Sequence, residues 1–126
     1  MEKTLVIDGK EVKMRASALI PRLYRFKFGR DIIKDMLTLK KAYDKVKELP
    51  ENATEEEKQN AQLSVLDLTI FENVAFIMAK HANPEVPDTP DEWLDGFETF
   101  SIYEVMPQIL ELWNMNQKTT SEPKKK

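Results

Sequence analysis

The chain has 126 residues, a length typical of one domain, and it contains no cysteine and a single histidine. This composition excludes disulfide bonds, thiol catalysis and cysteine-ligated metal centres. The formal net charge of -3 conceals a strong asymmetry. Residues 13–50 contain eleven basic and four acidic side chains, whereas residues 51–116 contain two basic and fourteen acidic ones. That division argues against a uniformly basic nucleic-acid-binding protein.

No apolar run in the sequence approaches the length of a transmembrane helix, and the apolar stretch near the first residue is too short for a signal peptide. Because cysteine is also absent, we expect an intracellular protein. The three glycines, at positions 9, 29 and 96, are too far apart to form a glycine-rich phosphate loop.

The first fifteen residues predict a β-hairpin. A β-rich run at residues 4–7 and an alternating run at residues 10–15 flank the dipeptide Asp8-Gly9. Asp-Gly favours the two-residue type I′ turn, in which both central residues have positive φ. Two strands alone are only marginally stable, so we expect the apolar face of this hairpin to pack on the rest of the protein.

The spacing of apolar residues predicts five helices after the hairpin. The first runs from a Ser17 cap to about Phe28 and stops at Gly29, which can adopt the left-handed conformation. The second begins at Asp31 and ends before Pro50. The other three begin at capping boxes, in which a Ser or Thr and a Glu three residues later cap the helix reciprocally, and these boxes start at Thr54, Thr89 and Ser101.

The third of these helices is predicted to run without a break from Thr54 to Lys80. Its first half is polar, whereas its second half is strongly apolar, so we expect the second half to be the central and most buried helix. The residues expected to face inward are Leu63, Leu66, Ile70, Phe71, Val74, Ile77 and Met78.

The predicted fold class is α+β, mainly α, with the N-terminal β-hairpin packed on a small bundle of about five helices. Residues 1–116 are expected to form one domain. Residues 117–126 lack apolar side chains, and this composition predicts a disordered C-terminal tail.

The sequence offers no convincing catalytic, metal or cofactor site. His81 has no cysteine or second histidine to join it, and we interpret it as a polar residue in the last turn of the third helix. The densest group of acids could bind Mg²⁺ in principle, but EF-hand spacing and an accompanying phosphate-binding group are absent, and a solvated helix start explains these acids without a ligand. These acids are Asp88, Asp91, Glu92 and Asp95. We therefore expect a protein that is not an enzyme.

Residues 22–30 interleave cations with aromatic rings, and two interpretations of this segment remain open. Such a pattern suits phosphate contact and base stacking, so one alternative is a small nucleic-acid-binding protein. The same residues also fit an ordinary helix with one apolar face. The candidate partner-binding residues here are Arg22, Arg25, Phe26 and Arg30.

A second candidate surface is the aromatic-rich end of the chain. Large aromatic side chains serve both as core and as anchors for partners, and spacing does not separate these roles. We expect most of this group in the core and some of it exposed. Its members are Trp93, Phe97, Phe100, Tyr103 and Trp113.

Five segments, taken in their order along the chain, resemble a known protein family, although no single one of them is specific to it. They are IDGKE at residues 7–11, RLYRFKFGRD at 22–31, FIMAKHA at 76–82, DEWL at 91–94 and FSIYEVMPQILELW at 100–113. Together they resemble the tail assembly chaperones of long-tailed bacteriophages and of prophages of Gram-positive bacteria, over about residues 4–116.

This resemblance implies a non-enzymatic protein without a cofactor that acts in the host bacterial cytoplasm. Such chaperones bind the long helical tape measure protein, keep it soluble, help to recruit tail tube subunits and are absent from the mature virion. The resemblance also implies that the partners are proteins and that the protein does not bind a membrane.

A chaperone of this kind needs exposed apolar surface that binds helices with little sequence specificity. Coating a long client also favours self-association. One hypothesis is that the basic residues Arg22, Arg25, Lys27 and Arg30 meet the acidic segment 85–98 of a neighbouring copy. The alternative is that these charges neutralise each other within one molecule.

Overall fold

The computed structural model describes residues 1–57 and 63–120, and of residues 115–120 it describes only the backbone. The fold is α+β and mainly α, as predicted. One antiparallel hairpin precedes the helices, and a single further helical turn lies at residues 55–57. The elements are β1 (Glu2–Ile7), β2 (Lys10–Arg15), α1 (Ile20–Phe28), α2 (Ile32–Lys47), α4 (Val65–Ala82), α5 (Pro90–Leu94) and α6 (Ile102–Thr120).

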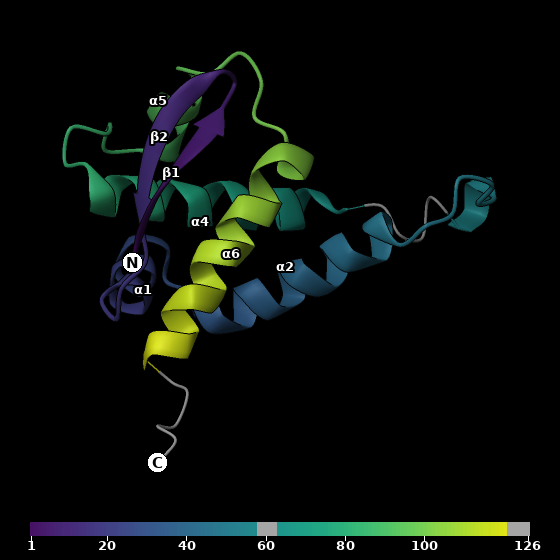
Figure 1. Ribbon diagram of the computed structural model, residues 1–126, viewed down its shortest axis with the longest axis horizontal. Coiled ribbons are helices and arrows are strands. Elements are labelled where there is room, and N and C mark those ends of the chain that lie inside the picture. Colours follow the sequence, from purple (N-terminus) through teal and green to yellow (C-terminus); the bar gives the residue numbers. More distant parts are fainter. Residues whose placement is uncertain (58–62, 121–126) are drawn as a thin grey trace.

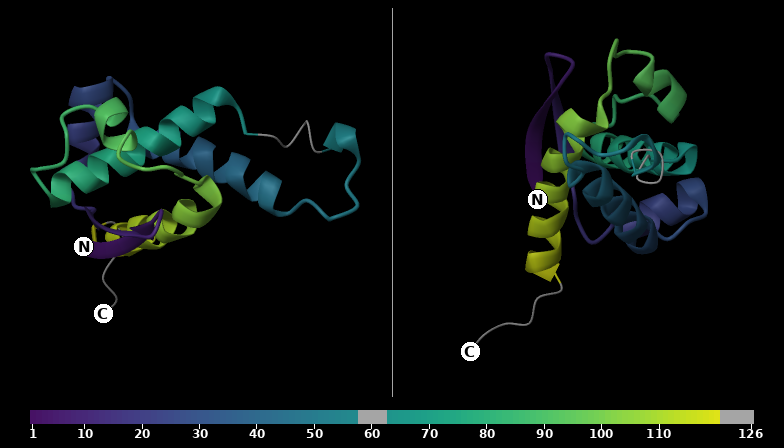
Figure 2. Two further views of the ribbon diagram at one scale, coloured as in Figure 1. Left: turned by 90° about the horizontal axis from the view of Figure 1, so that it is seen from above. Right: turned by 90° about the vertical axis from the view of Figure 1, so that its right-hand side faces the viewer.

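Helix α4 lies at the centre, and the other elements are arranged around it (Figure 1). The hairpin packs on it through β2, while α1, α2, α5 and α6 each contact another part of its surface. The two views of Figure 2 show that α2 and the start of α4 extend side by side away from the hairpin. The molecule is therefore elongated, with α1 near one end and residues 51–57 at the other.

The hairpin forms as the Asp-Gly signal predicts. Asp8 and Gly9 both have positive φ, and Ile7 pairs with Lys10 across the two-residue turn. The carboxylate of Asp8 accepts hydrogen bonds from the amide of Glu98 and the hydroxyl of Thr99. The amide of Glu98 holds the pKa of this carboxyl below its ordinary value. The turn is thereby joined to the segment that leads into α6.

The core is built around the apolar second half of α4, which confirms that this segment is the most buried helix. Ile70, Phe71 and every residue from Val74 to Ala79 are buried. A helix that is apolar on all sides is stable only when it is covered on all sides. The covering residues come from every other named element and include Leu5, Met14, Ile20, Tyr24, Met36, Leu39, Trp93, Ile109 and Leu112.

The prediction of one continuous helix from Thr54 to Lys80 is wrong. Thr54 and Glu57 do form their capping box, but α4 begins anew at Val65. Ser64 is in an extended conformation and caps the amide of Asp67, whose carboxylate accepts from the amide of Ser64. This second capping box starts a separate helix, because Ser64, its N-cap residue, has an extended and not a helical backbone.

Several helix ends also differ in detail from the sequence prediction. Ser17 does not cap α1, whose N-cap is Leu19 without a side-chain hydrogen bond. Thr89 caps α5 as predicted, whereas the Ser101 hydroxyl accepts from the amide of Tyr103 rather than that of Glu104. Helix α6 continues to Thr120, so residues 117–120 of the expected tail are helical, and residues 121–126 lie outside the described part.

One buried carboxylate joins α1 to α2. Asp35 is buried, and it accepts two hydrogen bonds from the Arg30 guanidinium, at 2.7 and 2.9 Å, and one from the Tyr24 hydroxyl at 2.8 Å. Hydrogen bonding to Arg30 holds the pKa of Asp35 below its ordinary value of 3.8, while burial raises the pKa of Tyr24. The ion pair thus fixes how the two helices meet at the Gly29 turn.

We expect Asp35→Asn to lower the free energy of unfolding by about 2 kcal/mol at pH 7, because the charged partner of two strong hydrogen bonds is lost. The depressed pKa means that Asp35 stabilises the fold fully above about pH 4, the range of an unfolded Asp, and loses this effect as the pH falls through its folded pKa. The difference between the wild type and the variant should therefore shrink below that range, as measured by urea unfolding between pH 7 and pH 2.5.

Asp44→Asn is the matched control. It removes a carboxylate from the same helix, but one that pairs with Lys40 at the surface. Exposed pairs at this spacing contribute little, so we expect a change of less than about 0.5 kcal/mol. An Asp35→Asn protein as stable at pH 7 as the Asp44→Asn protein would show that the Arg30–Asp35 pair does not support the fold.

Candidate binding surfaces

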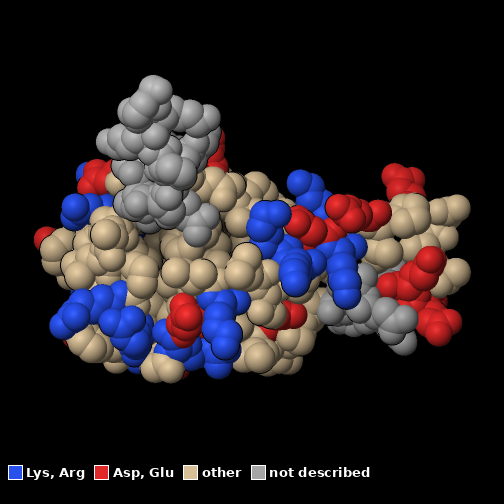
Figure 3. Space-filling view, turned by 90° about the horizontal axis from the view of Figure 1, so that it is seen from below, with Lys and Arg blue, Asp and Glu red and all other residues tan. Residues whose placement is uncertain are grey.

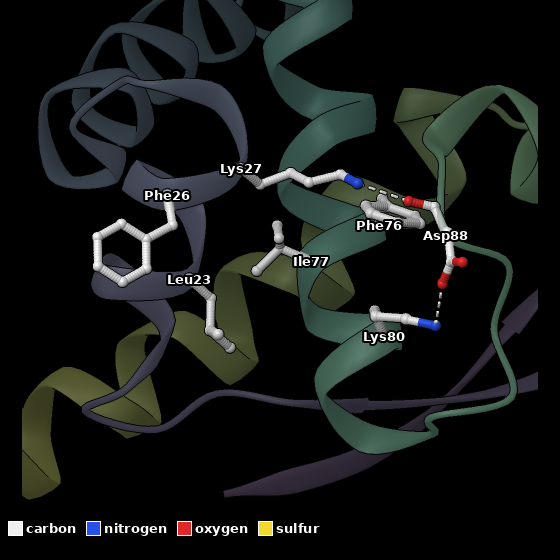
Figure 4. Close-up of a pocket in the computed structure, with 7 residues that line it drawn as sticks. All are labelled: Leu23, Phe26, Lys27, Phe76, Ile77, Lys80 and Asp88. Carbon is white, nitrogen blue, oxygen red and sulfur yellow. Dashed lines mark hydrogen bonds and ion pairs between the residues drawn. The ribbon is translucent and has the colours of Figure 1, made fainter.

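An open apolar groove lies between α1 and α4 (Figure 4). Leu23, Phe26 and Lys27 come from α1, and Phe76, Ile77 and Lys80 come from α4. Asp88, from the loop before α5, closes one end. The groove has a volume of about 370 Å³ and a mostly apolar lining. We call these seven residues the α1–α4 groove.

Phe26 stands at the outer edge of the α1–α4 groove and is 69% exposed. The Arg22 guanidinium lies 4.6 Å from the centre of its ring, which is a cation–π contact, and Arg25 is exposed on the same helix. These three predicted residues are therefore accessible to a partner. Arg30 differs from them, because its guanidinium is engaged by Asp35 within the same molecule.

The acidic segment before α5 borders the groove on the same molecule. The Lys27 ammonium donates to the backbone carbonyl of Asp88 at 2.6 Å, and the Lys80 ammonium lies 3.1 Å from the Asp88 carboxylate. Lys27 of α1 thus contacts the backbone of this acidic segment, whereas the Asp88 carboxylate pairs with α4.

A second apolar surface lies between α2 and α6. Ile33 and Leu37, at i and i+4 on α2, are 48% and 59% exposed, and they line a furrow with Leu110 and Trp113 of α6. Met36 also lines this furrow, which has a volume of about 90 Å³. We call this surface the α2–α6 furrow. Sequence periodicity had placed Ile33 and Leu37 on the apolar face of their helix, but it did not show that they would be left uncovered.

The aromatic-rich end is mostly core, as expected. Trp93 is buried and touches the rings of Phe76, Phe97 and Phe100, and the two last rings are half-buried. Trp113 is also buried, with an edge on the α2–α6 furrow. Tyr103 is the exposed member, and its ring centre lies 6.2 Å from that of Tyr43 on α2.

Burial within the fold shifts the pKa of His81, a candidate from the sequence, and of Glu72, which the sequence did not single out. The His81 Nε2 atom lies 2.9 Å from the Ser17 hydroxyl, and burial lowers the pKa of His81. Burial also raises the pKa of Glu72, with Asp91 adding to the shift. Within residues 1–57 and 63–114, no three His, Asp or Glu side chains gather in a way that could hold a metal ion. Nor does any helix in the described chain have the length and apolar character to cross a membrane.

The exposed start of α4 is a feature that the sequence prediction missed. Val65 is 82% exposed and Leu66 is 55% exposed, although Leu66 was expected in the core, and Leu68 is also exposed. The register of the inward face is as predicted, since Ile70, one turn after Leu66, is buried. Leu66 is exposed because the start of α4 extends away from the hairpin (Figure 2). The S-x-x-D pattern of residues 64–67 was the available signal that a helix begins there.

Comparison with known proteins adds no relative: no family model, curated protein or solved structure matches the chain. The assignment of function therefore depends on the surfaces described above.

We expect Phe26→Ala to change the free energy of unfolding by less than about 0.5 kcal/mol, because the ring is largely in solvent. Phe71→Ala, the matched substitution in the core, should cost about 3–5 kcal/mol, since that ring is only 1% exposed. Urea unfolding of both variants measures the contrast. Equal losses would mean that Phe26 is structural and that the α1–α4 groove is not a free surface.

Proposed function

We propose that this protein is a non-enzymatic tail assembly chaperone, which binds the tape measure protein and helps to recruit tail tube subunits in the host cytoplasm. The observation that carries the proposal is the exposed apolar α2–α6 furrow. Leu37 lies one helical turn after Ile33 on α2. Leu110 and Trp113 of α6 line the other side of the furrow. Two apolar helix faces beside each other form the kind of surface on which a third helix packs.

The chemistry of the furrow suits a client that is long, helical and variable in sequence. Its walls are aliphatic and aromatic, and Met36, which can adapt its shape, also lines it. Lys40 and Asn114 are the polar residues of its lining. Apolar contact with few fixed hydrogen bonds gives binding without strict sequence selection, which is what coating a long helical protein requires.

A nucleic-acid-binding role remains the alternative, and the exposed pair Arg22 and Phe26 favours it. A stacked cation and ring on a basic helix could contact phosphate and base together. This role would use α1 and not the furrow, so the two functions are separable by experiment.

We expect Leu37→Glu to abolish co-purification with the tape measure protein, because a client helix would have to bury the new carboxylate. The measurement is co-expression with a tape measure protein of a long-tailed phage, followed by affinity capture and quantification of soluble client. The loss should exceed tenfold. Val6→Glu is the matched control, since Val6 is similarly exposed but lies on β1, outside the furrow.

Two results would contradict the proposal. One is that the wild-type protein captures and solubilises no such client. The other is that Leu37→Glu and Val6→Glu bind it equally. Salt-sensitive retention on DNA or RNA that Arg22→Glu removes would instead support the nucleic-acid-binding alternative.

A further inference from the structure

We infer that the α2–α6 furrow binds helices that carry carboxylates along one edge of their apolar stripe, and that a row of lysines on α2 sets the direction in which such a helix lies. This inference rests on the proposed function, which places the client in the furrow, and it names the charge pattern of the client segment. It depends on the length of the furrow and on the charges along its two sides.

The α2–α6 furrow lies between two antiparallel helices. Ile33 and Trp113 line it near the start of α2. Further along α2, the ring centre of Tyr43 lies 6.2 Å from that of Tyr103, which is 57% exposed. Higher residue numbers on α2 thus lie beside lower numbers on α6, so the two chain directions are opposite. Residues 33–43 span about 15 Å of helix, which is enough for a bound helix to make contacts over several turns.

The side of α2 that faces away from α6 is basic. Lys40 lines the furrow, on the side of Leu37 nearer to α6. Lys34 and Lys41, at i−3 and i+4 from Leu37, are exposed and do not line the furrow, so they lie on the other side of Leu37. Lys45 is exposed one turn after Lys41 and continues the row. We call Lys34, Lys41 and Lys45 the α2 lysine row.

The ammonium groups of the α2 lysine row have no carboxylate partner among the described residues. The two aspartates of α2 are engaged elsewhere, since Asp35 binds Arg30 and Asp44 pairs with Lys40. Figure 3 shows Lys and Arg side chains gathered over the part of the molecule that contains α1 and α2. Acidic groups of a partner can therefore approach this row without displacing an internal ion pair.

The outer side of α6 has the opposite charge. Glu104 and Glu111 lie two helical turns apart and are exposed, and residues 102–114 contain no cation. Glu111 pairs with Lys3 of β1, so these carboxylates lie on the side of α6 that faces away from α2. The furrow is therefore bordered by cations along α2 and by carboxylates along α6.

A helix bound in the furrow meets different charges along its two edges. Carboxylates along one edge of its apolar stripe lie beside the α2 lysine row when the helix runs in one direction, and beside Glu104 when it runs in the other. The first arrangement is favoured by attraction, whereas the second is disfavoured by repulsion. Turning a helix end for end exchanges its edges, so the charge pattern of the client fixes its direction on the protein.

Two synthetic helical peptides of about 20 residues test the charge preference. They share one apolar stripe of Leu and Met, and one peptide carries Glu along one edge of the stripe where the other carries Lys. Fluorescence anisotropy measures the binding of each peptide at low and at high salt.

The protein variants reverse two charges on one helix at a time. Lys34→Glu/Lys41→Glu acts on the α2 lysine row, and the matched control Arg22→Glu/Arg25→Glu makes the same change of charge on α1, outside the furrow. All four positions are exposed, so the fold should be retained, which circular dichroism would verify. Lys34→Gln/Lys41→Gln, which removes the charges without reversing them, is the milder second variant.

We expect the wild type to bind the Glu-edged peptide roughly tenfold more tightly than the Lys-edged peptide at low salt, and to lose most of this preference at high salt. Lys34→Glu/Lys41→Glu should reverse the preference, and Lys34→Gln/Lys41→Gln should reduce it. The control on α1 should keep it.

Moving the Glu residues to the other edge of the stripe should turn the bound peptide end for end. A nitroxide label at the N-terminus of the peptide broadens the amide NMR signals of the protein residues nearest to it. With Glu on one edge these should be the signals around Ile33, and with Glu on the other edge they should be the signals around Tyr43.

The inference is overturned if the wild type binds both peptides equally, if Lys34→Glu/Lys41→Glu leaves the preference unchanged, if the control on α1 removes it, or if the label stays at one end of the furrow with both arrangements. Binding of neither peptide would also overturn it, and ultracentrifugation would then show whether a second copy covers the furrow. Equal binding that Leu37→Glu abolishes would mean that the furrow takes helices regardless of charge. The proposed function would then stand, because capture of the tape measure protein in co-expression decides it separately.

Discussion

The structure depends on the need to cover the second half of α4. Ile70, Phe71 and the run from Val74 to Ala79 are buried around the whole circumference of this helix. No single neighbouring helix can cover such a segment, because each buries only one face against it. The hairpin, α1, α2, α5 and α6 therefore all contact α4. The short α1 and the two-stranded hairpin, which would be marginal alone, are stabilised by this packing.

Covering one helix with several small elements leaves parts of those elements uncovered. Helix α1 buries Ile20 and Tyr24 and directs Phe26 outward, while α2 buries Met36 and Leu39 but leaves Leu37 in solvent. The buried Asp35 fixes the join between these helices, so they cannot rotate to hide the exposed residues without breaking its bonds to Arg30 and Tyr24. The two apolar surfaces are thus consequences of how the core is covered.

Local signals with a defined stereochemistry were predictable from the sequence. The Asp8-Gly9 turn, the left-handed Gly29 and the Asp31 cap are fixed by a few adjacent residues, and all three were predicted correctly. What could not be predicted depends on distant contacts or on competition between similar signals. Thr54 and Ser64 are both good caps, and apolar periodicity does not reveal that Ser64 interrupts the helix. Likewise, the amphipathic pattern of α2 identifies Leu37 as apolar, but whether another element covers it is decided by the tertiary arrangement.

The fold shows where the acidic residues of the second half of the sequence lie. Within the acidic half, the Asp88 carboxylate pairs with Lys80 of α4, and its backbone carbonyl accepts a hydrogen bond from Lys27 of α1. The acids of residues 51–57 lie at the far end of the molecule (Figures 1 and 3). The acidic half of the sequence is therefore divided in the fold, with Asp88 beside the α1–α4 groove and residues 51–57 at the far end.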